Sequence, residues 1–146
     1  MFNENLSATG NLTIELFDGF GGLKSSETVN NLVVTSGLSY IASRIKDATA
    51  TAMSHMAVGS GSSAATLADT TLGSELGRVA LTSTSVTTNA VTYSASFGAG
   101  VGTGAITEAG LFNAASAGTM LCRTVFSVVN KSAGDTLVIT WIVTIS

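Results

Sequence analysis

The chain has 146 residues, and only 10% of them are charged, with a formal net charge of −3 at pH 7. This length fits one domain, and six scattered Lys and Arg residues make no basic face of the kind that binds nucleic acid. The single cysteine excludes an internal disulfide framework and a multi-cysteine zinc site. No apolar stretch approaches the ~20 residues of a membrane-spanning helix, so we expect no membrane partner.

The surface is expected to be weakly charged, since the mean hydropathy is +0.47. A free monomer normally keeps more charge for solubility, so this composition hints that a partner covers part of the surface. The alternative is a small Ser- and Thr-rich β domain that solvates its surface with hydroxyl groups. The chain contains no proline, so glycine marks the turns.

We divide the chain into an N-terminal arm or irregular start at residues 1–10 and one β domain at residues 11–146. Residues 11–18 alternate between apolar and polar side chains, which is typical of a strand. A glycine-rich turn at residues 19–22 leads to a second strand at residues 28–35, and the two strands can form a hairpin.

One helix is predicted at residues 36–46. Thr35 or Ser36 can cap its start, and Arg44 and Lys46 suit the negative end of the helix dipole. Apolar residues recur at helical spacing and form one stripe; they are Leu38, Ile41, Ala42 and Ile45.

The middle of the chain alternates short strands and glycine-rich loops. We expect a strand at residues 54–59, a loop rich in Gly, Ser, Ala and Thr at 59–71 and a short helical turn at 72–77. Residues 78–86 and 90–97 are then predicted to form one long hairpin.

Three further strands are predicted towards the C-terminus, at residues 105–113, 119–129 and 135–146. Short strands at regular intervals with turn signals between them favour a sandwich or barrel. The predicted fold class is therefore all-β, a jelly-roll-like antiparallel β-sandwich or barrel, with one short helix inserted near residues 36–46. The large aromatic side chains fall at inward strand positions and are expected in the core; they are Tyr93, Phe97, Phe112, Phe126 and Trp141.

The sequence offers no constellation for catalysis, a cofactor or a metal. Its single histidine, His55, lies in an apolar strand and is interpreted as a structural or interface residue. Asp69 and Glu75 flank a loop and could bind an ion, but they lack the spacing of an EF-hand. The glycine- and serine-rich residues 59–63 resemble a phosphate-binding loop only weakly, because no Gly-Lys-Ser/Thr follows, and they are interpreted as a flexible surface loop. Cys122 is expected to be an inert core residue.

Glu108 is the exception among the acids, because it lies within an apolar strand. A charge in such a place usually needs a partner. We therefore predict a structural ion pair between Glu108 and either Arg78 or Arg123.

Three parts of the chain together resemble small structural proteins of tailed bacteriophages, the capsid-decorating (cement) proteins. They are residues 30–45 (NNLVVTSGLSYIASRI), residues 53–61 and 70–78 (MSHMAVGSG and TTLGSELGR), and residues 106–126 and 134–141 (ITEAGLFNAASAGTMLCRTVF and GDTLVITW). The third part is the most specific.

The resemblance implies a virion structural protein and no enzyme. It would decorate the outer surface of the capsid and stabilise it by bridging major capsid protein subunits, after synthesis in the cytoplasm of the bacterial host. A homo-oligomer, dimer or trimer, is expected. The alternative is a tail-fibre, baseplate or receptor-binding module. An N-terminal arm could dock on a neighbour through Met1, Phe2 and Leu6, unless the terminus is merely frayed.

Overall fold

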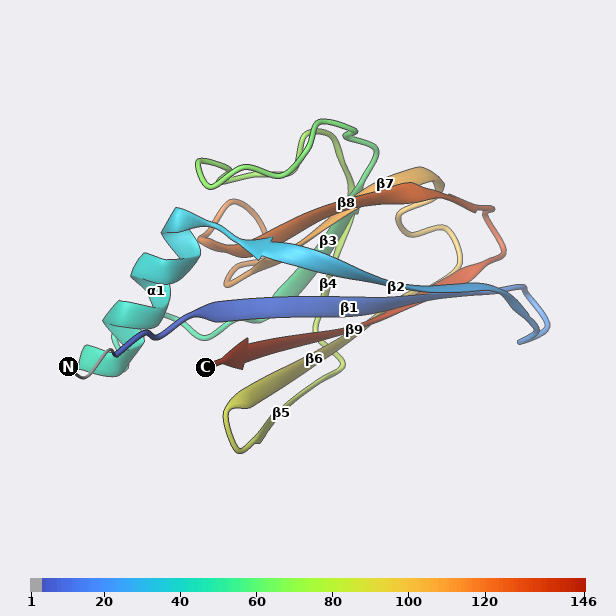
Figure 1. The fold of residues 1–146 in the computed structure, drawn as a ribbon. Coiled ribbons are helices and arrows are strands. Elements are labelled where there is room, and N and C mark those ends of the chain that lie inside the picture. Colours follow the sequence, from blue (N-terminus) through green and yellow to red (C-terminus); the bar gives the residue numbers. More distant parts are fainter. Residues whose placement is uncertain (1–3) are drawn as a thin grey trace.

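A computed structural model describes residues 4–146 (Figure 1). Within them, one helix lies among nine antiparallel strands that follow one another from edge to edge in the order β4-β3-β7-β8-β2-β1-β9-β6-β5. The elements are β1 (Ala8–Phe17), β2 (Leu23–Val33), α1 (Thr35–Lys46), β3 (His55–Gly59), β4 (Glu75–Ala80), β5 (Ser83–Thr87), β6 (Ala90–Phe97), β7 (Gly104–Phe112), β8 (Met120–Lys131) and β9 (Thr136–Ile145). The predicted all-β fold class is confirmed, as a sheet curled into a half-barrel.

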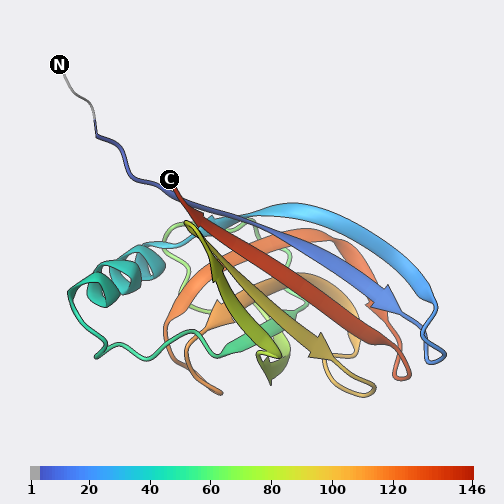
Figure 2. The ribbon, with the colours of Figure 1, turned by 90° about the horizontal axis from the view of Figure 1, so that it is seen from below.

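The curled sheet has two halves that face each other across the core. Strands β2, β1, β9, β6 and β5 form one half, and β4, β3, β7 and β8 form the other. The halves join where β2 meets β8, and only Leu32 and Val33 of β2 take part in that pairing. The strands β4 and β5 are consecutive in the chain yet lie at opposite edges of the sheet, so residues 81–82 carry the chain from one edge to the other. In Figure 2, β9 runs between β1 and β6 in the five-stranded half.

Alternating side chains of the paired strands build the core. The register places Leu12 of β1 opposite Trp141 of β9, and Trp141 opposite Tyr93 of β6. All three side chains are buried, together with Phe97 and Phe112. Successive side chains of a strand point to opposite faces, so the alternation of apolar and polar residues places these side chains on the buried face of the sheet. The prediction that the large aromatic residues lie in the core is confirmed.

The α1 helix rests on β8 through a close contact at its first turn. Gly37 is its only buried residue, and a Cβ atom there would overlap the backbone carbonyl of Leu121. The residue that caps the helix is Val34, and no side chain forms a cap hydrogen bond. The predicted cap by Thr35 or Ser36 is therefore wrong; the Ser36 hydroxyl donates instead to the carbonyl of Met120, 3.0 Å away.

Several predicted segment boundaries are also wrong. Residues 8–10 belong to β1, so they are not part of an arm, and Ser7 exchanges backbone hydrogen bonds of 2.6 and 2.8 Å with Ser146. No helical turn forms at residues 72–77, because β4 begins at Glu75. The single strand predicted at residues 78–86 is split into β4 and β5.

Within residues 4–146, no helix has both the length and the apolar character that a bilayer crossing requires.

Candidate functional site

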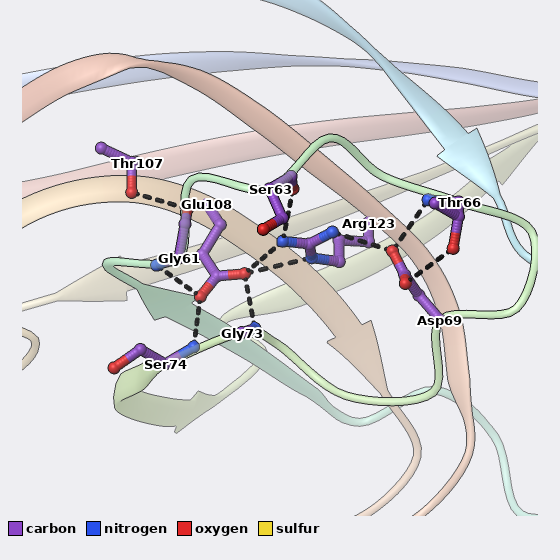
Figure 3. A network of polar contacts seen from close by, with 9 residues as sticks. All are labelled: Gly61, Ser63, Thr66, Asp69, Gly73, Ser74, Thr107, Glu108 and Arg123. Carbon is purple, nitrogen blue, oxygen red and sulfur yellow. Dashed lines mark hydrogen bonds and ion pairs between the residues drawn. The ribbon is translucent and has the colours of Figure 1, made fainter.

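The β7 strand carries a carboxylate into the protein interior. Glu108 is fully buried, and its two oxygens accept five hydrogen bonds (Figure 3). The backbone N–H groups of Gly61 and Ser74 donate to Oε1 at 2.8 and 2.7 Å, and that of Gly73 donates to Oε2 at 2.8 Å. Arg123 of β8 supplies the other two, from Nε at 3.0 Å and Nη2 at 2.9 Å. The charge is therefore paired and its lone pairs are occupied, as a buried carboxylate requires.

Two glycines let the backbone approach this carboxylate closely. A Cβ atom on Gly59 or Gly61 would lie within about 2.6 Å of Glu108 Oε1, so a larger residue at either position would displace the carboxylate. Within the glycine- and serine-rich residues 59–63, the backbone N–H of Gly61 does bind an anion, but that anion is the Glu108 carboxylate of the protein itself, and the other backbone donors come from Gly73 and Ser74.

Arg123 extends the network to the loop between β3 and β4, residues 60–74, which we call the anchored loop. Its Nη1 donates to Asp69 Oδ2 at 2.8 Å, and its Nη2 also donates to the carbonyl of Ser63 at 3.0 Å. Asp69 in turn accepts from the backbone and hydroxyl of Thr66, both at 2.9 Å. Contacts along its length therefore tie this loop to the buried side chains of Glu108 and Arg123.

The network also sets the acidity of its carboxyl groups. Burial alone would raise the pKa of Glu108, but the backbone donors of Gly73 and Ser74, the Arg123 side chain and Gly61 together lower it. The pKa of Asp69 is lowered in the same way, against its burial, by Thr66 and Arg123. Both acids are therefore held in their ionised form.

Of the two arginines predicted as partners of Glu108, the structure pairs it with Arg123 and not with Arg78. The guanidinium of Arg78 binds Glu75 at 2.7 Å and lies 3.8 Å from the ring centre of Phe112. It also donates to the carbonyls of Ala114 and Ala117. Arg78 thus joins β4 to the turn after β7. Glu75 and Asp69 are both engaged in ion pairs.

An apolar groove of about 370 Å³ lies between α1 and the five-stranded half of the sheet. We call it the α1 groove; its walls include Tyr40, Ile41 and Ile45 of α1 and Met53, Tyr93 and Val143 from elsewhere. Arg44 is the one charged residue among its lining residues, and its guanidinium donates to the carbonyl of Ala50 at 2.7 Å. Burial, with Tyr40 and Cys122 nearby, raises the pKa of Tyr93, so its phenol stays neutral. The groove is apolar and nearly uncharged.

The apolar stripe of α1 continues onto the surface beside this groove. Leu38 is 47% exposed and Ile45 is 75% exposed. The two line a smaller apolar hollow together with Leu6 and Ile145, and Leu6 is itself 72% exposed. The sheet therefore covers only part of the stripe. Met1 and Phe2, the other predicted contact residues, lie outside the described residues.

The remaining candidates for chemistry are spread apart. Ser54 Oγ lies 2.8 Å from His55 Nδ1. Among residues 4–146, no group of three His, Cys, Asp or Glu side chains could hold a metal ion. Cys122 is fully buried, and burial raises the pKa of its thiol well above the ordinary value.

Sequence reasoning missed two parts of this arrangement. The backbone donors around Glu108 come from Gly61, Gly73 and Ser74, and only the glycine spacing in the loop could have indicated them. The α1 groove joins residues that are distant in the chain, and the apolar stripe of the helix was its one sequence signal.

Comparison with known proteins gives no further identification. No protein-family model matches the chain. No curated protein matches it, and no solved structure does.

Proposed function

We propose that this protein is a structural protein of a bacteriophage virion, which decorates the capsid and stabilises it by bridging major capsid protein subunits. The observation that carries the proposal is the uncovered apolar surface made by the α1 groove and the exposed part of the helix stripe. We propose that an apolar, uncharged segment of a major capsid subunit occupies it. The resemblance of residues 106–126 to cement proteins supports the same function.

The charge of the surface supports this choice of occupant. The α1 groove offers one guanidinium, that of Arg44, which already donates to a backbone carbonyl, and Tyr93, one of its two tyrosines, remains neutral. A charged segment would lose its hydration there without gaining a partner. Apolar surface is worth roughly 25 cal/mol per Å² when it leaves water, so an apolar segment gains from binding.

The rigidity of the scaffold supports a stabilising function. A protein that binds the assembled shell and not the free subunit stabilises the shell in proportion to that preference. Such a preference needs contact surfaces held at a fixed separation. The buried pair of Glu108 and Arg123 and the anchored loop provide that stiffness on the side of the sheet formed by β3, β7 and β8.

The first test is the number of copies per virion, measured by quantitative mass spectrometry of purified particles against the major capsid protein. A ratio near one, or a simple fraction of one, is expected for a decorating protein. A handful of copies per particle would contradict the proposal and favour a tail-fibre, baseplate or receptor-binding module.

The second test probes the α1 groove by cosedimentation of the purified protein with assembled shells and with free capsid subunits. Ile45→Asp is expected to weaken shell binding at least tenfold, since one buried aliphatic side chain contributes about 1.5–3 kcal/mol. Ile45 is mostly exposed, so the variant should fold. Phe20→Asp is the matched control, because Phe20 is fully exposed in the β1–β2 turn, which lies at the opposite end of the protein from α1 (Figure 1). Equal binding of both variants would exclude the groove as the contact.

A further inference from the structure

The β5 strand forms a second surface, which adjoins the α1 groove at Thr84. Among the strands of residues 4–146 it pairs with β6 alone, and all five of its residues are exposed. The hairpin that it forms with β6 lies at the bottom of Figure 1. A strand with one neighbour presents a row of unpaired backbone N–H and C=O groups on its other side, which is a template for a further strand.

This edge lacks the protection that natural edge strands usually carry. Proteins guard such edges with charged side chains, especially Lys, or with Pro. The chain contains no proline, and no Asp, Glu, Lys, Arg or His lies between Arg78 and Glu108. By contrast, β2 and β4 also have edges that are largely unpaired, and β2 carries Lys24 and Glu27 while β4 begins at Glu75 and includes Arg78.

We propose that β5 pairs antiparallel with β5 of a second copy of this chain, forming a two-fold symmetric dimer through which the sheet continues from one copy into the other. The symmetric register that uses the whole strand places Ser85 opposite Ser85 of the second copy and Thr84 opposite its Val86. Val86 is 71% exposed in the single copy, and the dimer covers it on both sides of the symmetry axis.

A second copy of this chain fits the β5 edge better than a charged partner does. Self-pairing brings Ser85 opposite Ser85 and Ser83 opposite Thr87, and cross-strand hydroxyl pairs stabilise strands. The protein already contains such a pair, because Thr13 Oγ1 of β1 and Thr28 Oγ1 of β2 lie 3.1 Å apart. The net charge of −3 does not oppose the contact, since the charged residues are absent from the β5–β6 hairpin. A charged partner would find no counter-charge there.

The contact is small, so the dimer should be weak and dependent on concentration. Two five-residue strands bury less than the ~1,200 Å² at the lower end of stable interfaces. We expect a dissociation constant on the order of micromolar.

Sedimentation velocity of the purified protein across a concentration series, with no phage component present, tests the proposal. The wild-type protein is expected to pass from monomer to dimer. Ser85→Lys and Ser85→Glu each place like charges opposite each other at the symmetry axis and should weaken the dimer more than tenfold. An equimolar mixture of the two variants should recover it as a heterodimer, because Lys then faces Glu.

Ser26→Lys is the matched control, since Ser26 is also an exposed strand serine but lies on β2; it should leave the dimer unchanged. A wild-type protein that remains monomeric at several hundred micromolar would overturn the proposal. A dimer that persists in Ser85→Lys would also overturn it. The same holds if the equimolar mixture of Ser85→Lys and Ser85→Glu fails to form a dimer. All of these outcomes are measured on the purified protein without any phage component, so they do not depend on whether the protein binds a capsid.

Discussion

Arg123 lies diagonally across from Glu108 on the neighbouring strand, since it is opposite Gly110 in the register of β7 and β8. Two of its nitrogens donate to the same oxygen of Glu108, at 3.0 and 2.9 Å. Both side chains are buried, with 3% and 0% of their surface exposed. Removal of either partner leaves the other as an uncompensated charge in the interior.

We therefore expect Glu108→Gln to lower the free energy of unfolding by about 3–5 kcal/mol. Arg123→Gln should lower the free energy of unfolding by a similar amount, because it also removes the hydrogen bonds from Arg123 to Asp69 and to the carbonyl of Ser63. The double variant should cost clearly less than the sum of the two, since each single change already breaks the pair. Urea denaturation checks all three, with Glu4→Gln, an exposed carboxyl, as the control. Strict additivity of the two single changes would contradict a coupled pair.

Acid should destabilise the protein through the same network. The pKa of Glu108 and that of Asp69 are lower in the folded protein than their ordinary values of 4.5 and 3.8. A lowered carboxyl pKa contributes stability that is fully present above the ordinary value and is lost as the pH falls through the folded value. These two groups should therefore cause no change in the free energy of unfolding with pH near neutrality. Below about pH 4.5 they should cause it to fall as the pH falls.

The measurement is urea denaturation at a series of pH values between 2 and 7. Below pH 4.5, the free energy of unfolding should change less steeply with pH in Glu108→Gln and in Asp69→Asn than in the wild type. The reason is that each variant removes one group that takes up a proton on unfolding. A slope unchanged by both substitutions would show that other carboxyl groups cause the acid sensitivity.

Gly37→Ala should destabilise the protein, although the same change inside a helix normally stabilises it by about 1 kcal/mol. The new Cβ atom would overlap the backbone carbonyl of Leu121, and backbone cannot move aside as a flexible side chain can. Overpacking of this kind costs about 1–3 kcal/mol. Thermal unfolding measures the change, and Ser39→Ala on the exposed side of α1 should be neutral or slightly stabilising. A stabilised Gly37→Ala variant would mean that α1 is held more loosely against β8.

Thr88→Gly should stabilise the β5–β6 hairpin. Thr88 occupies the tip of the hairpin with a φ of 54°, a left-handed conformation that is unfavourable for a β-branched residue by roughly 1–2 kcal/mol. Glycine adopts it without strain, although its greater freedom in the unfolded chain offsets part of the gain. We expect a net gain of about 0.5–1 kcal/mol in thermal unfolding. As a control, Thr87→Gly in the adjoining strand should destabilise instead.

The inward-facing strand residues could be predicted because their period is local. Leu12, Ile14 and Leu16 alternate with polar residues, and each is buried as that pattern requires. Glu108 could be identified as paired because a charge inside an apolar strand has few other options. The choice of Arg123 over Arg78 could not be made, since it depends on which strand lies beside β7.

Other features depend on the tertiary arrangement. The sequence from Arg78 to Val86 continues without a turn signal, yet the chain changes sheet edges at residues 81–82. The apolar stripe of α1 has the same spacing whether a sheet or a partner covers it, so periodicity could not show that Leu38 and Ile45 are exposed. The backbone donors around Glu108 have no signal in the sequence other than the glycines of the loop.

The position of β9 has a consequence for biosynthesis. It is the last strand in the sequence, but it lies between β1 and β6, and β1 pairs with it along its whole length, from Ala8 opposite Ile145 to Phe17 opposite Thr136. The first hairpin, β1 and β2, thus emerges from the ribosome with one side of β1 open until residues 136–145 have been made. Such long-range pairing slows folding and leaves strand edges available for aggregation in the meantime. Yield in a bacterial host should therefore be sensitive to translation rate and temperature.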